Sequence, residues 1–198
     1  MVLHRRSPTS LSTWVCRTRR SSVVTTTWRR YSDERTRSGP KLVADLSSAA
    51  WDRRWLDLAT LIGSWSKDRS RGVGCVFVGS ANQILSTGYN GLPRGVDDDV
   101  EQRHERPEKY DWFEHAERNA IFNAARTGTQ LEGSVAYSSL FPCVACARAI
   151  IQVGGSTLVT HTPDLDDDRW GREFELSTAM LKEAGVTLRL LEETQTSD

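Results

Sequence analysis

Two short motifs, in which Cys143 follows His115 by 28 positions, constrain the fold of this chain more than any other feature. His115-Ala-Glu117 offers an imidazole and a carboxylate, and Pro142-Cys143-Val-Ala-Cys146 offers two thiols. A structural zinc site is usually closed by four protein ligands, whereas three ligands leave a position for water, which the metal acidifies near neutral pH. We therefore expect Zn²⁺ to be held by His115, Cys143 and Cys146, with Glu117 beside them as a proton carrier.

The sequence around the two cysteines predicts a helix start. Cys143 opens an apolar run to Val153 at helical spacing, so its sulfur shares one face with the sulfur of Cys146. In the first turn, the unpaired amides and the helix dipole favour thiolates. Taken alone, a C-x-x-C pair is also typical of a redox pair, of half a structural zinc site or of two buried cysteines.

His115 and Glu117 precede a second predicted helix, over residues 114–126. Residues two apart do not face each other in a regular helix, so the two side chains converge only at its first turn. Without that convergence, Glu117 is an ordinary acid that favours a helix N-terminus.

Composition bounds the domain count and the kind of substrate. The chain has 198 residues, 38% of them hydrophobic, which suits one sizeable core better than two. Basic and acidic residues number 26 each, but seven arginines lie in the acid-free residues 1–32, so the remainder has a net charge of about −7. Such a body lacks the broad positive face of a protein that grips nucleic acid, which favours a small substrate. No apolar run reaches membrane-spanning length.

Residues 1–32 resemble a mitochondrial or plastid transit peptide. They hold twelve serines and threonines beside the seven arginines, and Arg29-Arg30-Tyr31 predicts mitochondrial processing after Tyr31. A disordered tail or an incorrect upstream start codon is the alternative, and the protein would then be cytoplasmic. Cys16 and Cys75 are well separated, which indicates a reducing compartment rather than a disulfide scaffold.

Hydrophobic periodicity predicts a polar linker over 33–48, one folded domain over 49–192 and a short tail over 193–198. An amphipathic helix is expected from Trp51 to Trp65, with its tryptophans in the core. The later elements alternate between strands (73–79, 83–89, 134–139, 157–161, 186–191) and helices (114–126, 143–153, 169–184), with a long polar loop over 91–112.

These elements predict an α/β fold, a three-layer α/β/α sandwich with a mixed five-stranded sheet. The first two strands form a hairpin, whereas the helix before the last strand is long enough for a parallel crossover. Both motif helices begin after strands. The zinc site should therefore lie at one edge of the sheet, where two helix N-termini meet.

The chain resembles the deoxycytidylate deaminases of the zinc-dependent cytidine deaminase superfamily over roughly residues 50–192. The similar segments are Trp65-Ser-Lys-Asp68, Val73-Gly-Cys-Val76, Gly88-Tyr-Asn-Gly-Leu-Pro-Arg-Gly95, His115-Ala-Glu-Arg-Asn-Ala-Ile121, Leu140-Phe-Pro-Cys143 and Ala184-Gly-Val-Thr187. The resemblance implies a cytidine deaminase-like fold and a hydrolase that converts dCMP to dUMP and ammonia in pyrimidine nucleotide biosynthesis. Glu117 would protonate N3 of the base and carry a proton to the departing amine.

The resemblance also implies substrate contacts. Backbone groups near Ala116 and Phe141 would orient the base, and Asn90 would contact the sugar, although an Asn-Gly turn chosen for its backbone conformation is an equal alternative. Lys67 and Arg94 are candidates for the 5′-phosphate, and each is otherwise an ordinary surface charge.

Two features depart from the family pattern. Many relatives carry a cysteine where this chain has Glu114, and the segment from Asp97 to Trp112 is unusual. His104 within it is more readily a solvated loop histidine than a second metal ligand. The resemblance further implies a homo-oligomer and regulation by dCTP and dTTP.

Two other functions stay open on sequence grounds. The same metal motif suits a deaminase of another nucleoside or nucleotide, or of a tRNA base, although the acidic body argues against an RNA substrate. A zinc-stabilised regulatory subunit without turnover is the second alternative, and the intact Glu117 argues against it.

Overall fold

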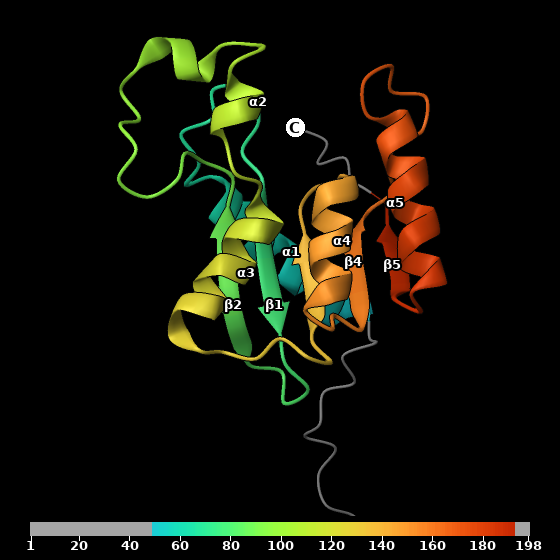
Figure 1. Cartoon of the computed structure of the whole chain (residues 1–198). Helices are drawn as coiled ribbons and strands as arrows, with labels where there is room; N and C mark the ends of the chain where they lie inside the picture. The colour runs from blue at the N-terminus through green and yellow to red at the C-terminus, as the bar shows by residue number, and fades with distance from the viewer. Residues whose placement is uncertain (1–48, 193–198) are drawn as a thin grey trace, which may run out of the picture. The chain divides into compact units, whose positions relative to one another are not determined.

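The computed structural model describes residues 49–192, which form a five-stranded sheet in the order β2-β1-β3-β4-β5 (Figure 1). The predictions for residues 1–48 and 193–198 lie outside the described residues. The strands are β1 (Gly74–Val78), β2 (Ile84–Tyr89), β3 (Val135–Ser138), β4 (Thr157–His161) and β5 (Thr187–Leu191).

The mixed sheet follows from the lengths of the connections. β1 pairs antiparallel with β2 through a short turn, in which Asn82 takes a left-handed φ of 60° that asparagine tolerates better than most residues. β1 also pairs antiparallel with β3, whereas β3, β4 and β5 are parallel and are joined by helical crossovers. The predicted change from antiparallel to parallel pairing is confirmed.

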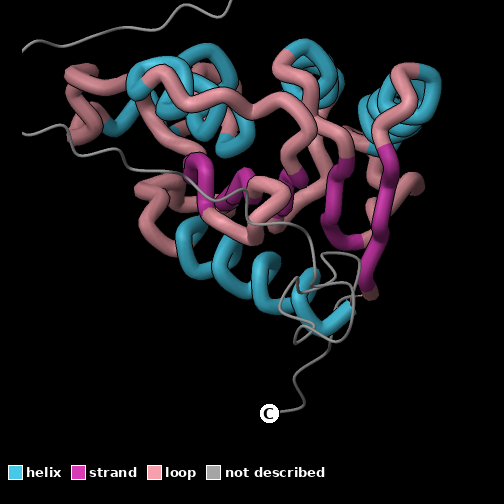
Figure 2. The backbone as a smooth tube through the Cα atoms, turned by 90° about the horizontal axis from the view of Figure 1, so that it is seen from below, coloured by secondary structure: helices cyan, strands magenta, loops and turns pink. Residues whose placement is uncertain are grey.

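Helices cover both faces of the sheet, as Figure 2 shows, so the predicted three-layer sandwich is confirmed. α1 (Ala49–Gly63) packs on one face, and α3 (Ala116–Thr127), α4 (Val144–Gln152) and α5 (Gly171–Glu183) cover the other. β1 is buried on both sides. Cys75 and Phe77 face the core under α3 and α4, and Val76 and Val78 face the core under α1.

Gly88 of β2 fixes the position of α3. A Cβ atom at this position would lie 2.3 Å from the backbone nitrogen of Ala120 and 2.4 Å from the carbonyl oxygen of Ala116. The neighbouring Ser86 hydroxyl donates to the carbonyl oxygen of Ala120 at 2.6 Å. The first turn of α3 therefore lies directly on the strand, which sets where His115 and Glu117 stand.

The prediction for the first helix is wrong at its C-terminal end. The helix ends at Gly63, where a Cβ atom would lie 2.9 Å from the backbone nitrogen of Gly74. Trp65 consequently falls beyond the helix, is 58% exposed, and meets the ring of Tyr89 edge-on. The buried face instead includes Asp52, whose carboxylate accepts hydrogen bonds from Tyr137 (2.9 Å) and Arg189 (2.7 Å).

The predicted loop over 91–112 contains two short helices, the 3₁₀ helix η1 (Glu101–His104) and α2 (Lys109–Trp112). His104 has its Nε2 atom 2.7 Å from the carbonyl oxygen of Asp98 and packs edge-on against Phe113. It does not belong to the cluster of metal-binding side chains found in the described residues. In that same part of the chain, no helix is long and apolar enough to cross a membrane.

Candidate active site

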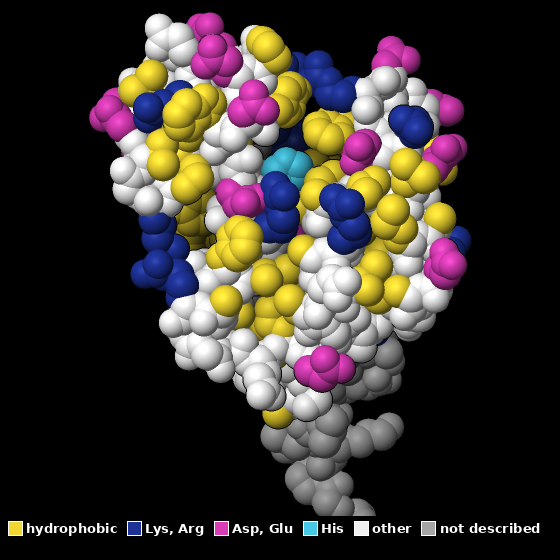
Figure 3. Space-filling view, in the orientation of Figure 1, with side chains coloured by type: hydrophobic (Ala, Val, Ile, Leu, Met, Phe, Trp, Pro, Cys, Tyr) yellow, Lys and Arg dark blue, Asp and Glu magenta, His cyan; other side chains and the backbone are white. Residues whose placement is uncertain are grey.

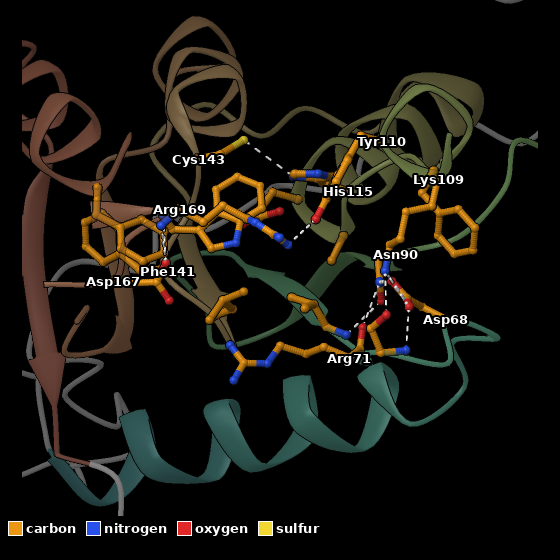
Figure 4. A pocket seen from close by; sticks show the side chains of 18 of the residues that line it. Asp68, Arg71, Asn90, Lys109, Tyr110, His115, Phe141, Cys143, Asp167 and Arg169 are labelled. Atoms are coloured by element: carbon orange, nitrogen blue, oxygen red, sulfur yellow. Dashed lines mark hydrogen bonds and ion pairs between the residues drawn. The ribbon is translucent and has the colours of Figure 1, made fainter. Parts of the chain in front are cut away.

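His115, Cys143 and Cys146 meet where two helices begin, as the sequence predicts. His115 and Cys143 are the N-cap residues of α3 and α4, both with extended backbone angles, and neither side chain caps its own helix. Their side chains turn towards each other instead (Figure 4). The His115 Nδ1 atom lies 3.4 Å from the sulfur of Cys143 and 3.5 Å from that of Cys146.

This geometry fits a zinc ion. With zinc–sulfur bonds of about 2.3 Å and zinc–nitrogen bonds of about 2.0 Å, tetrahedral coordination separates the ligand nitrogen and sulfur by roughly 3.5 Å. The three ligand atoms all lie within 4.8 Å of one another. The Glu117 carboxylate is not among them, so the cluster supplies the three ligands of an open site.

The two thiols differ in acidity. Hydrogen bonds from Cys146 and His115 outweigh burial and hold the pKa of Cys143 well below its usual range, at about 3. The pKa of Cys146 is raised, because its thiol is held in the hydrogen bond to Cys143 and because it is buried. The hydrogen bond to Cys143 also raises the pKa of His115. Cys143 is thus ready as a thiolate, and zinc binding would release the remaining protons from Cys146 and His115.

Glu117 stands in the first turn of α3 and is only 3% exposed. Its carboxylate accepts a hydrogen bond of 3.2 Å from the hydroxyl of Ser138, at the end of β3. Burial raises the pKa of Glu117 above its ordinary value, although the charge of His115 opposes the rise. A carboxyl group with a raised pKa takes up and releases protons closer to neutral pH.

The cluster opens into a cavity of about 580 Å³. Figure 3 shows the corresponding hollow, with Lys and Arg side chains at its edge. The cavity lies between the segment that carries α2 and the N-terminal end of α5 (Figures 1 and 4). Its lining side chains include, besides His115, Glu117 and Cys143, the aromatic residues Tyr110, Phe113, Phe141, Trp170 and Phe174 and the basic residues Arg71, Arg106, Lys109 and Arg169.

The residues predicted to bind substrate divide into two groups. Asn90, Ala116 and Phe141 line the cavity. Lys67 and Arg94 are not among the lining residues: Lys67 pairs with Asp98 at 2.5 Å on the surface, and Arg94 donates to the side chain of Asn123 at 2.8 Å. The geometry therefore gives no support to these two as phosphate contacts.

The amide of Asn90 is nearly saturated with hydrogen bonds. Its two N–H groups donate to the carboxylate of Asp68 and to the carbonyl oxygen of Arg71, each at 3.0 Å. Its side-chain oxygen accepts from the backbone N–H of Val73 at 2.7 Å. Only one lone pair of that oxygen remains, so Asn90 can serve a sugar hydroxyl solely as an acceptor.

Sequence reasoning missed the basic residues that do line the cavity, Arg71, Arg106, Lys109 and Arg169. Arg71 and Arg106 form no ion pair within the described part of the chain. These basic residues come from three segments that are distant in sequence, and the cavity is also lined by the acidic residues Asp68, Asp167 and Asp168.

The α2 segment closes one side of the cavity through Tyr110. The hydroxyl of Tyr110 accepts a hydrogen bond from Arg169, and its ring meets that of Trp170 edge-on at 6.3 Å. Trp170 in turn stacks on Phe174, which meets Phe141 edge-on at 5.5 Å. A continuous aromatic wall thus runs from α2 towards the metal cluster and suits a planar ring.

Similar sequences and structures are those of deaminases. Residues 49–162 match the family model of the cytidine and deoxycytidylate deaminase zinc-binding region. A deaminase of Aliivibrio fischeri, named for its place in the luxG 3′ region, is 42% identical over 144 residues, which are 71% of this chain and 93% of that protein. Human deoxycytidylate deaminase is 35% identical over 144 residues, which are 70% of this chain and 78% of that protein.

Among solved structures, the dCMP deaminase of cyanophage S-TIM5 in complex with dCMP and dUMP has the same fold. The match has a TM-score of 0.60 and 22% identity, and covers 73% of this chain and 98% of that one. The family match includes His115, Glu117, Cys143 and Cys146, whose side chains converge at the two helix starts. The chain therefore belongs to the zinc-binding family of cytidine and deoxycytidylate deaminases.

Proposed function

We propose that this protein hydrolyses dCMP to dUMP and ammonia. The main support is the buried Glu117 beside the metal cluster of His115, Cys143 and Cys146. The cavity next to them has an aromatic wall and two arginines, Arg71 and Arg106, that form no ion pair among the described residues. Human deoxycytidylate deaminase, at 35% identity, supports the choice of substrate. We further propose that the product enters the supply of thymidylate precursors.

His115, Cys143 and Cys146 would hold the zinc ion. When bound there, zinc supplies the acidity that makes water a nucleophile near neutral pH. Glu117 would take a proton from the attacking water and give it to N3 of the cytosine ring, and would then carry the second proton, from the hydroxyl added at C4, to the departing amine. Burial and the hydrogen bond from Ser138 keep this carboxylate in one position.

The base would lie against the aromatic wall. Phe141 is 3% exposed and packs against Phe174, so its position is fixed before a ligand enters. Backbone groups near Phe141 and Ala116, which both line the cavity, would pair with the polar edge of the base. The remaining lone pair of Asn90 would accept a hydrogen bond from the sugar.

Arg71 and Arg106 are better candidates for the 5′-phosphate than Lys67 and Arg94. Both line the cavity and form no ion pair among the described residues, although the charge of Arg71 acts on Asp167, which lines the same cavity. A guanidinium group binds phosphate through charge-assisted hydrogen bonds. Arg71→Gln and Arg106→Gln should lower kcat/KM for dCMP by about 10-fold or more and change that for deoxycytidine much less. If Lys67→Gln and Arg94→Gln have this effect instead, the assignment is wrong.

A substrate panel tests the reaction itself. Zinc-loaded protein is incubated with dCMP, deoxycytidine and a tRNA anticodon stem, and released ammonia is measured. We expect kcat/KM to be highest for dCMP. Turnover of the RNA alone would overturn the proposal in favour of a tRNA deaminase, and no turnover by zinc-loaded protein would favour a regulatory subunit.

We also propose that the protein forms a homo-oligomer. Phe122 of α3 is 50% exposed, and Figure 3 shows hydrophobic side chains gathered on the face that α3 and α4 present. A second copy of the chain would cover this face. Light scattering should give a mass above that of one chain, and Phe122→Glu should lower it more than Leu176→Glu on α5 does. A monomeric wild-type protein would refute this assembly.

Two further proposals rest on the family and on the leader composition. dCTP and dTTP would regulate turnover. Rate measurements at fixed dCMP with each added nucleotide would test this, and unchanged rates would exclude it.

Residues 1–32 would direct the protein to mitochondria. N-terminal sequencing of the native protein should find Ser32 first, whereas a retained Met1 would speak against import.

A further inference from the structure

Lys109 is a buried lysine on α2 whose ammonium group points at one carboxylate. Its Nζ atom lies 2.8 Å from each carboxylate oxygen of Asp68 and 3.1 Å from the hydroxyl of Ser70. The side chains of Lys109 and Asp68 are 8% and 7% exposed. Both residues line the cavity, and Figure 4 shows them with Asn90 on one side of it, opposite Arg169.

This ion pair is the central one of three between the same two segments. Lys67, Asp68 and Arg69 are consecutive and pair with Asp98, Lys109 and Glu101. The two outer pairs have side chains that are 40–65% exposed, so they contribute little. Only the central pair is buried and faces the cavity. The two outer pairs already link the segments, so the burial of the central pair in the cavity wall indicates a further role.

The hydrogen bonds of Asp68 show why its carboxylate needs the positive charge of Lys109. Besides Lys109, the carboxylate accepts hydrogen bonds from the backbone N–H of Ser70 at 2.8 Å and from the side chain of Asn90 at 3.0 Å. Those two donors are neutral, so Lys109 is the positive charge that balances the carboxylate. Without it, an uncompensated negative charge would face any anion in the cavity.

We propose that Lys109 is a positioning residue which neutralises Asp68 and thereby lets the cavity prefer a phosphorylated substrate. The inference rests on the proposed function, because it assumes a nucleotide with a 5′-phosphate. Lys109 acts through Asp68 and Asn90 and makes no contact with the phosphate. Asp68 in turn holds the amide of Asn90, whose other N–H group holds the carbonyl oxygen of Arg71.

A double-mutant cycle separates this role from direct phosphate binding. The variants are Lys109→Met, Asp68→Asn, the double variant and Lys109→Arg, with Arg69→Met as the matched control for an exposed pair between the same segments. For each, kcat and KM are measured with dCMP and with deoxycytidine, together with the inhibition constant of inorganic phosphate. Zinc content and thermal unfolding are recorded alongside.

We expect Lys109→Met to raise the KM for dCMP and to lower the ratio of kcat/KM for dCMP over deoxycytidine by about 10-fold or more. Lys109→Arg and Arg69→Met should keep the ratio. The double variant should restore it to within about 3-fold of wild type, because the unbalanced carboxylate is gone. A double variant as poor as Lys109→Met would overturn the proposal and indicate direct contact between Lys109 and phosphate.

The Asp68→Asn variant tests the proposed role of Lys109 by itself, even if Lys109→Met does not fold. Removing the carboxylate frees the charge of Lys109, so inorganic phosphate should bind this variant more tightly than wild type. Unchanged or weaker phosphate inhibition would contradict the proposal. Wild-type protein that does not deaminate dCMP would refute the proposed function itself, whereas normal wild-type turnover with an unchanged ratio in Lys109→Met would refute only the role of Lys109.

Discussion

The hydroxyl of Ser138 donates a 3.2 Å hydrogen bond to the carboxylate of Glu117, and so links the end of β3 to the first turn of α3. Ser138 is fully buried, so water does not replace this donor readily. Ser138→Ala should lower kcat by about 3- to 10-fold while zinc content stays at one ion per chain, because the carboxylate loses one of its positioning contacts. Steady-state kinetics with metal analysis checks this. A kcat equal to wild type would show that packing alone positions Glu117.

The metal cluster predicts that Cys143 is needed for both zinc and stability. Cys143→Ala removes one of three ligands, so zinc should be lost on dialysis and the melting temperature should fall to that of the chelator-treated wild type. Cys75→Ala is the matched control, since Cys75 is a buried cysteine outside the cluster. Loss of zinc in both variants would mean that the effect is one of folding and not of ligation.

Gly88 predicts a packing requirement at the base of the site. In Gly88→Ala, the new Cβ atom would meet backbone atoms of Ala116 and Ala120 at 2.4 and 2.3 Å, which cannot move without displacing α3. We expect a loss of about 2–3 kcal/mol in the free energy of unfolding, and weaker zinc binding because His115 begins α3. Gly91→Ala, where a Cβ atom would have only ordinary contacts, should lose much less in urea unfolding. Equal losses would refute the requirement.

The pair between Asp68 and Lys109 predicts a dependence of stability on pH. Burial alone would raise the pKa of Asp68, but the hydrogen bonds from Lys109 and Ser70 outweigh it and hold the pKa below its ordinary value. The pair therefore stabilises the protein fully above the unfolded pKa of about 3.9, and loses this contribution as the pH falls through the lower folded value. Between pH 5 and pH 3, Asp68→Asn should lose less free energy of unfolding than wild type. Parallel curves would contradict the shift.

The sequence predicts the layers of the fold and the metal cluster because both depend on local patterns. Spacing along the chain placed His115 and Cys143 at helix starts, and the N-cap geometry agrees. The charged side chains that line the cavity were not predicted because they are distant in sequence: Asp68 and its partner Lys109 are 41 positions apart. Trp65 was misplaced because periodicity cannot sense that Gly63 must meet β1 closely and end the helix there.

The most direct test of the central claim is the yield of dUMP and ammonia from dCMP, measured with zinc-loaded wild-type protein and with Glu117→Gln. The amide keeps the shape of the side chain and removes no metal ligand, but it cannot carry a proton. We predict equal amounts of dUMP and ammonia from wild type, and a rate lower by about 100-fold or more in Glu117→Gln with its zinc retained. A zinc-loaded wild type that releases no dUMP, or a variant of near-normal rate, would contradict the account.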